Sequence, residues 1–174
     1  MVPDTSLRLA SIRKALDEIV RPALAEDAGF AQEQLGLILK SIDLVREQIP
    51  YEYALHAHDA HAAARFAREL AGKLPGAATA LGEAASAAEA LAPATLPDMP
   101  ALAAAVRDLR AAIETAVADA GSDPGTLAAI GPVVVEHSER QNLIERRWVL
   151  ATGFDPDPAG VPPLAEVLAA GFTD

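Results

Sequence analysis

The chain of 174 residues contains no cysteine, and aromatic residues make up only 4% of it. The absence of cysteine excludes disulfide bonds, thiol catalysis and zinc or iron–sulfur sites held by cysteine. With so few aromatic residues, a core has to be built from Leu, Ile, Val and Ala. Such a mixture suits close-packed helices better than sheets, which favour aromatic and β-branched residues.

The sequence also lacks long apolar runs and an excess of basic charge. No stretch reaches the roughly 18 uninterrupted apolar residues of a membrane span, and residues 1–9 lack the basic and apolar regions of a signal peptide. The net charge is −11, whereas binding to nucleic acid or to an anionic membrane requires a basic surface. We therefore expect no nucleic-acid or membrane partner and a cytoplasmic location, which the absence of cysteine also fits.

What the sequence does contain is helical periodicity, with apolar residues that recur every three or four positions. Prolines and glycines separate five or six such segments. Asp123-Pro124 is a strong helix start, while Pro22 and Gly131-Pro132 are expected to kink or break their helices. The two clearest stripes are Leu35, Ile38, Leu39, Ile42, Val45 and Ile49 in the second segment, and Leu102, Val106, Leu109, Ile113 and Val117 in the fifth.

These segments predict an all-α fold, a mostly antiparallel up-and-down bundle of five to six helices, because the connections between them are short. We expect a single domain over 1–152, with an internal Pro-rich linker at 93–100. An extended Pro-rich C-terminal arm over 153–174 should contain a short helical turn. The alanine-rich stretch 77–92 is expected to be helical, either packed closely through alanine or loosely held.

The third segment carries three of the four histidines within the run 56–61. Successive helical residues are about 100° apart around the axis, so each polar residue can be placed relative to the apolar stripe. Asp59 falls inside the stripe with His56 beside it, whereas His58, His61 and Arg65 fall on an outer flank. His56 and His58 are about 200° apart, so the cluster cannot be one site. The apolar stripe used for this placement is Leu55, Ala62, Phe66 and Leu70.

Polar residues also interrupt the apolar faces of other helices. On the last helix, His137, Gln141 and Glu145 share the inward face at i, i+4 and i+8. Arg46 lies close to the stripe of the second helix, and Arg13 lies at the edge of the first. Because a buried charge without a partner is costly, we expect a polar layer. In that layer the carboxylates of the third and last helices, Asp59 and Glu145, would be neutralised by Arg46, Arg13 or the histidines.

These residues permit a metal site as an alternative to simple hydrogen bonding across helices, which is the commoner arrangement. His56, Asp59, His137 and Glu145 would form a mixed nitrogen and oxygen site if the third and last helices face each other. The Glu-x-x-His pairs of di-iron bundles and the His-Glu-x-x-His pattern of zinc proteases are both absent. No cofactor is predicted, and the metal identity is left open.

Catalysis has weaker support in the sequence. His137 beside Glu145 or Asp59 would resemble a general base oriented by a carboxylate. However, Ser138 turns about 100° away from it, and the Gly-x-Ser-x-Gly pattern of a nucleophile elbow is missing. We therefore lean away from an enzyme.

The sequence favours a non-catalytic binding or accessory module, expected to be a homo-oligomer, most simply a dimer. The narrow stripes of the second and fifth helices would allow a dimer through a helix pair, or they would form the internal seam of the bundle. The alternative is a bundle that binds a metal or a small ligand in a polar internal site. A third possibility is a pH-responsive element, because the flank of His58, His61 and Arg65 would gain like charge on acidification. The candidate ligand-binding residues are His56, Asp59, His137, Gln141, Glu145 and Arg46.

Overall fold

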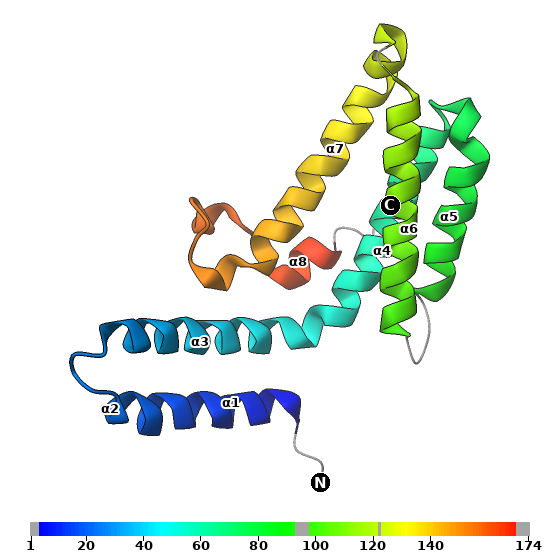
Figure 1. The fold of residues 1–174 in the computed structure, drawn as a ribbon. Helices are drawn as coiled ribbons and strands as arrows, with labels where there is room; N and C mark the ends of the chain where they lie inside the picture. The colour runs from blue at the N-terminus through cyan, green and yellow to red at the C-terminus, as the bar shows by residue number, and fades with distance from the viewer. Residues whose placement is uncertain (1–3, 93–97, 122, 170–174) are drawn as a thin grey trace. The chain divides into compact units, whose positions relative to one another are not determined.

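The computed structural model describes residues 4–92, 98–121 and 123–169 (Figure 1). These residues form helices joined by turns and contain no strand, which confirms the prediction of an all-α bundle. In this part of the chain no helix is long and apolar enough to cross a membrane. The longer helices are α1 (Thr5–Ala15), α3 (Gly29–Gln48), α4 (Glu52–Ala71), α5 (Ala78–Leu91), α6 (Met99–Asp119) and α7 (Pro124–Trp148).

Shorter helical turns complete the described structure. A π-helical turn, η1 (Leu16–Val20), joins α1 to α2 (Arg21–Ala23), and α8 (Leu164–Ala169) is the short helical turn predicted near the C-terminus. The remaining turns are of the 3₁₀ type: η2 (Ile49–Tyr51), η3 (Pro75–Ala77), η4 (Leu150–Thr152) and η5 (Pro158–Gly160).

The chain divides into two compact units, and this division differs from the predicted single domain with an arm. The hairpin unit comprises Met1–Glu52 and Arg146–Pro162, and the bundle unit comprises Tyr53–Glu145 and Pro163–Asp174. The predicted arm is therefore shared between the units. Of the predicted linker at 93–100, residues 93–97 lie outside the described residues, whereas 98–100 cap and begin α6.

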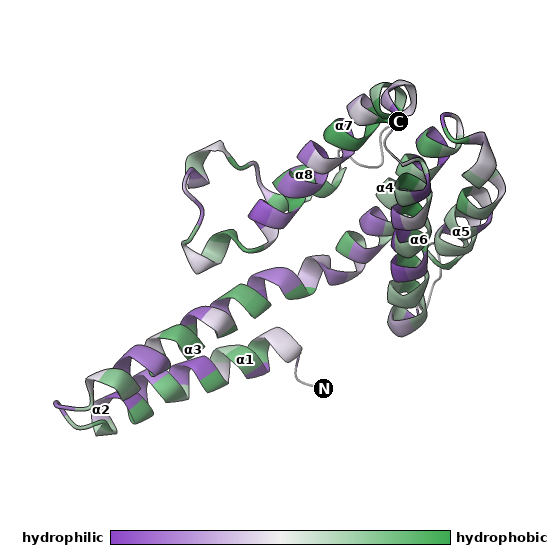
Figure 2. Ribbon diagram, turned by 45° about the horizontal axis from the view of Figure 1, so that its top comes forward, coloured by the Kyte–Doolittle hydropathy of each residue, from purple (hydrophilic) through white to green (hydrophobic). Residues whose placement is uncertain are grey.

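In the hairpin unit α1 and α3 lie side by side (Figure 1). Hydrophobic and hydrophilic stretches alternate along both helices (Figure 2). Pro22 lacks an amide N–H and its ring would clash with the carbonyl of Glu18 in a regular α-helix. The π-helical turn η1 precedes it, so the helix is widened at the proline and ends shortly afterwards, as the sequence predicts.

Ion pairs and hydrogen bonds hold the parts of the hairpin unit together. Arg13 Nε donates to both carboxylate oxygens of Asp43 at 2.8 Å, which ties α1 to α3. At the other end of α3, Arg147 pairs with Glu47 at 2.6 Å, and Gln48 Nε2 donates to the Trp148 carbonyl at 2.8 Å. The end of α7 therefore belongs with α3 rather than with the bundle core.

The bundle unit holds the main hydrophobic core, to which α4, α5, α6 and α7 all contribute. Its buried face on α4 consists largely of alanine, with Ala60, Ala64 and Ala67 fully buried. This face is turned by roughly a third of a turn from the predicted stripe through Ala62 and Phe66. The buried face of α4 is therefore made mainly of alanine, with Leu70 as its large fully buried residue.

The two neighbours of α4 confirm several predictions. On α5, Leu81, Ala85 and Ala88 are fully buried, so the alanine-rich stretch 77–92 is tightly packed. Two polar contacts support this packing, because Arg68 Nη1 donates to Glu89 Oε1 at 2.6 Å, and the Tyr53 hydroxyl donates to a carbonyl at the end of α5. On α6 the predicted stripe is also buried: Leu102, Val106, Leu109 and Ile113.

The start of α7 is also as predicted, since Asp123 Oδ2 accepts from the Thr126 amide at 2.7 Å and thereby caps the helix. A break or a kink is expected at Gly131-Pro132, and the structure contains no break there, because α7 continues through Pro132. In an α-helix a proline leaves the carbonyl four residues earlier without its amide partner, here that of Ala128. Both residues are exposed, so that carbonyl can be hydrated.

Overpacking the alanine face tests this account of the core. We expect Ala64→Leu to lower the free energy of unfolding by about 1–3 kcal/mol, because Ala64 is fully buried. Ala111→Leu on the exposed face of α6 should change it by less than about 0.5 kcal/mol. Urea denaturation followed by circular dichroism measures both, and equal effects of the two variants would contradict the packing described.

Candidate functional site

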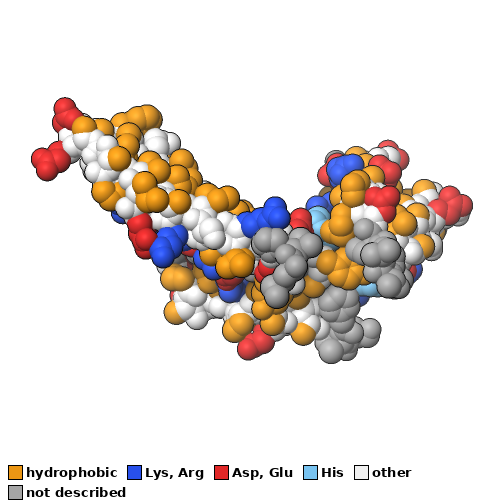
Figure 3. Space-filling model, turned by 90° about the horizontal axis from the view of Figure 1, so that it is seen from below, with side chains coloured by type: hydrophobic (Ala, Val, Ile, Leu, Met, Phe, Trp, Pro, Cys, Tyr) orange, Lys and Arg blue, Asp and Glu red, His pale blue; other side chains and the backbone are white. Residues whose placement is uncertain are grey.

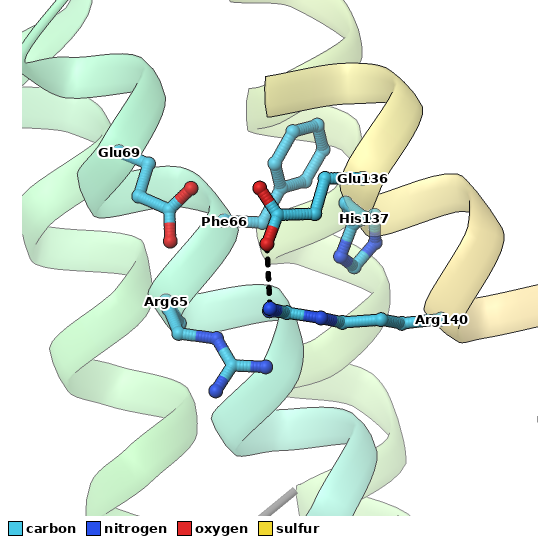
Figure 4. A pocket seen from close by; sticks show the side chains of 6 residues that line it. All are labelled: Arg65, Phe66, Glu69, Glu136, His137 and Arg140. Atoms are coloured by element: carbon cyan, nitrogen blue, oxygen red, sulfur yellow. Dashed lines mark hydrogen bonds and ion pairs between the residues drawn. The ribbon is translucent and has the colours of Figure 1, made fainter. Parts of the chain in front are cut away.

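Helices α4 and α7 face each other through an aromatic stack, at the place where the sequence predicts a polar site. The rings of Phe66 and His137 are parallel within 5°, with their centroids 4.1 Å apart (Figure 4). The sequence predicts both residues on inward faces. Burial lowers the pKa of His137, and the guanidinium groups of Arg110, Arg65 and Arg140 lower it further. The imidazole is therefore kept neutral as it stacks on the phenyl ring.

Asp59, also predicted to point inward, has a partner that the sequence analysis missed. Arg110 Nη2 on α6 lies 3.3 Å from Asp59 Oδ2, and the Asp59 side chain is 17% exposed. Its other oxygen, Oδ1, is buried without a hydrogen-bond partner among the described residues. The signal for Arg110 was present: it lies four residues after Val106 and three before Ile113, and therefore shares the face of the α6 stripe.

The other candidate residues do not join this cluster. Gln141 Nε2 donates to Glu145 Oε1 at 3.1 Å, but Glu145 is exposed, so its predicted neutralisation by a buried partner is wrong. His56 is half-buried. Arg46 belongs to the hairpin unit, where its Nη1 lies 3.6 Å from Asp43 Oδ1. Arg13 pairs with the same aspartate, so Arg13 joins α1 to α3, whereas the Arg46 pair lies within α3.

The predicted solvated flank of the histidine cluster is also wrong. His58 is only 5% exposed, and His61 and Arg65 are half-buried. The prediction failed because it took the inward direction of α4 from its large apolar residues. Burial lowers the pKa of His58, an effect that neighbouring Asp59 opposes.

The space beside the stack is too small for an organic ligand. The side chains shown in Figure 4 line a cavity of about 10 Å³, and on its α7 side Arg140 pairs with Glu136 at 2.5 Å. Such a volume holds at most one water molecule, whereas small-molecule pockets measure roughly 300–1,000 Å³. Within the described ranges, no three His, Asp or Glu side chains converge on a point that could hold a metal ion. The lining residues are Arg65, Phe66, Glu69, Glu136, His137 and Arg140.

A second candidate site is an apolar groove between α1 and α3. It has a volume of about 300 Å³ and an almost entirely apolar lining, apart from Gln34 and Ser41. Figure 3 shows hydrophobic side chains along this hairpin and acidic ones at the end where α2 connects to α3. Ile38 is 49% exposed, although the sequence places it in the same stripe as the buried Leu35 and Leu39. The apolar lining residues are Leu9, Leu37, Ile38, Ile42 and Val45.

The groove belongs to the unit with the weaker core. Buried apolar side chains of the hairpin unit are limited, among the described residues, to Leu35, Leu39 and Val161, and α1 buries none. By contrast, the exposed large hydrophobic residues concentrate in this unit, and those of the bundle unit, as far as the structure describes it, are Tyr53, Leu127 and Val135. A contiguous apolar surface that stays in contact with water usually marks a site of interaction with another molecule.

Comparison of the chain with protein-family models, with curated proteins and with solved structures gives no match.

The stack on α7 predicts a dependence of stability on pH. Burial lowers the pKa of His137 from its ordinary value of 6.5, so the unfolded chain takes up this proton at a higher pH than the folded chain does. The contribution of neutral His137 to the free energy of unfolding is therefore fully present above about pH 7. It declines as the pH falls through 6.5 towards the lowered pKa. His137→Gln should be less stable at pH 8 and should depend less steeply on pH between 7 and 5.

Thermal unfolding of wild type, His137→Gln and His56→Gln at intervals between pH 8 and 5 measures this effect. His56 lies in the same bundle unit but takes no part in the stack, so His56→Gln is the matched histidine control for loss of the stack. A slope unchanged by His137→Gln would contradict the buried, neutral state of His137.

The pair between Asp59 and Arg110 provides a separate test. Arg110→Gln leaves a largely buried carboxylate without its cation. We expect the free energy of unfolding to fall by about 1 kcal/mol. The loss is small because Arg110 is half-exposed and solvent weakens its attraction to Asp59. Combining it with Asp59→Asn should cost less than the sum of the single changes. Arg107→Gln, at an exposed position of the same helix, is the control. Additive effects in urea denaturation would show that the two side chains do not interact.

Proposed function

We propose that this chain is a non-catalytic binding module that holds an amphipathic helix of a protein partner in the groove between α1 and α3. The observation that supports this function best is the groove itself, a continuous apolar surface on a helix pair in which α1 buries no residue. Helical partners commonly bind by placing their apolar face in such a groove. Burying one Leu or Ile side chain contributes about 1.5–3 kcal/mol, so a few such contacts give a useful affinity.

The polar site between α4 and α7 supports the alternative function, binding of a metal or small ligand, less well. Its cavity is water-sized, and its charged groups pair with one another: Asp59 with Arg110, and Glu136 with Arg140. The pair of Asp59 with Arg110 suits a role in holding α4 to α6, and the stack of Phe66 on His137 suits one in holding α4 to α7.

A fluorescent label at the groove tests the proposed function. Since the chain has no cysteine, Ser41→Cys introduces a single thiol at the groove lining for an environment-sensitive dye. Ser86→Cys on α5 is a matched control, because each serine is exposed and donates to the carbonyl four residues earlier at 2.9 Å. The probe is a synthetic amphipathic helix of Leu, Ala, Glu and Lys with no net charge, titrated into nanomolar labelled protein.

We expect a saturable blue shift of the dye at position 41 and none at position 86. Ile38→Ser should weaken binding of the peptide about tenfold or more, because it removes roughly 1.4 kcal/mol or more of apolar burial. A dye at position 41 that does not respond, or an affinity that Ile38→Ser leaves unchanged, would contradict the proposed function.

A further inference from the structure

We infer that the groove between α1 and α3 is covered by the same surface of a second copy of this chain, in a two-fold symmetric dimer with antiparallel hairpins. The inference rests on the proposed function, since it identifies the helix partner that the groove accepts. Three observations carry it: the missing core of the hairpin unit, the size of the apolar surface, and the distribution of charge along the hairpin.

The hairpin unit needs apolar contacts that it does not make by itself. Its buried apolar side chains are Leu35, Leu39 and Val161 among the described residues, which is far fewer than the bundle unit has. A helix pair in which one helix buries nothing is marginal in water, since helices in proteins owe most of their stability to packing of an apolar face. A second hairpin supplies that face without any other component.

The surface has the size that a dimer requires. Residues 5–23 and 29–48 form the two arms of the hairpin, and since a standard interface takes about 20–30 residues from each partner, a dimer would use the whole length of one face of this pair. Exposed apolar residues occur along the whole length of both arms rather than at one spot. They are Leu7, Ile12, Ile19 and Val20 on the first arm, and Phe30, Leu37, Ile38 and Val45 on the second.

Charge is divided between the two halves of the hairpin. The half with the chain ends, residues 5–14 and 39–48, has Arg8, Arg13, Lys14, Lys40 and Arg46 against Asp43 and Glu47, a formal charge of 5 − 2 = +3. The half with the connecting turn, residues 15–38, has Asp17, Glu18, Glu26, Asp27 and Glu33 against Arg21, a formal charge of 1 − 5 = −4.

This division of charge determines the orientation of the two copies. In a two-fold dimer the same patch meets itself, so every contact occurs twice. Antiparallel hairpins place the acidic half of each copy over the basic half of the other, whereas parallel hairpins would place like charges together. Complementary potentials of this kind specify the pairing and suppress the wrong one. The two halves meet between residues 38 and 39, so the two-fold axis passes close to Ile38 and Ser41.

Sedimentation velocity of the full-length chain over a range of concentrations tests the dimer. We expect a concentration-dependent dimer in the wild type and a monomer for Ile38→Glu, whose helical circular dichroism should remain because Ile38 is half-exposed. The three lysines of the chain provide a charge test. Lys40→Glu should weaken the dimer about three- to thirtyfold at low salt and less at 0.5 M salt, whereas Lys73→Glu in the bundle unit should not.

Crosslinking tests the position of the axis. Ser41→Cys should form a disulfide-linked dimer under mild oxidation, and Ser86→Cys, its matched control, should not. A chain that stays monomeric at every concentration, or a dimer that persists in Ile38→Glu and does not crosslink through Cys at position 41, would overturn the inference. In either case a saturable response of the labelled groove to the amphipathic peptide would leave the proposed function standing, and loss of that response would remove both.

Discussion

The burial of an alanine face along α4 is the constraint on which the bundle unit depends. Ala60, Ala64 and Ala67 have no exposed surface, and the core residues of α5, α6 and α7 cluster with them. With so few aromatic residues in the chain, the core gains its burial from many small and aliphatic contacts. The polar groups next to this core are then placed by it, and this is why Asp59 meets Arg110 and His137 meets Phe66.

The hairpin unit has no comparable constraint, and its apolar residues remain largely in contact with water. Its two arms are joined by charged contacts, above all the bidentate pair of Arg13 with Asp43. Exposed ion pairs of this kind add little to the free energy of unfolding. They therefore determine the register of α1 on α3 but contribute little to the stability of the helix pair. The contrast between a well-packed unit and an under-packed one is the physical basis of the binding function proposed above.

The sequence predicts much of the fold because its periodicity and capping residues are strong. The stripe of α6, the cap at Asp123 and the helical turn near the C-terminus all follow from local patterns. The orientation of α4 did not follow, because alanine contributes little to an apolar stripe, although the alanines of α4 are its most deeply buried residues. The continuity of α7 through Pro132 depends on solvent exposure of that proline, which is a tertiary property.

The candidate site was predictable only in part, for a similar reason. Phe66 and His137 could be assigned to inward faces from spacing alone, and their helices do face each other. The partner of Asp59 is Arg110, which shares the face of the α6 stripe, but spacing within α6 does not show which helix that face meets. Arg46 lies close to the apolar stripe of α3, as its position in the sequence indicates. Its partner is Asp43 on the same helix and not a residue of the bundle unit. Sequence periodicity indicates that a residue points inward without indicating towards which helix.

The central claim is that the bundle unit is sufficient in itself while the hairpin needs a partner to be equally stable. Hydrogen–deuterium exchange of the full-length chain, measured at low and at high protein concentration, tests it most directly. The account predicts strong protection of α4, α5 and α6 at both concentrations, with weak protection of α1 and α3 in dilute solution that increases at high concentration. Protection of α1 equal to that of α6 in dilute solution would contradict it.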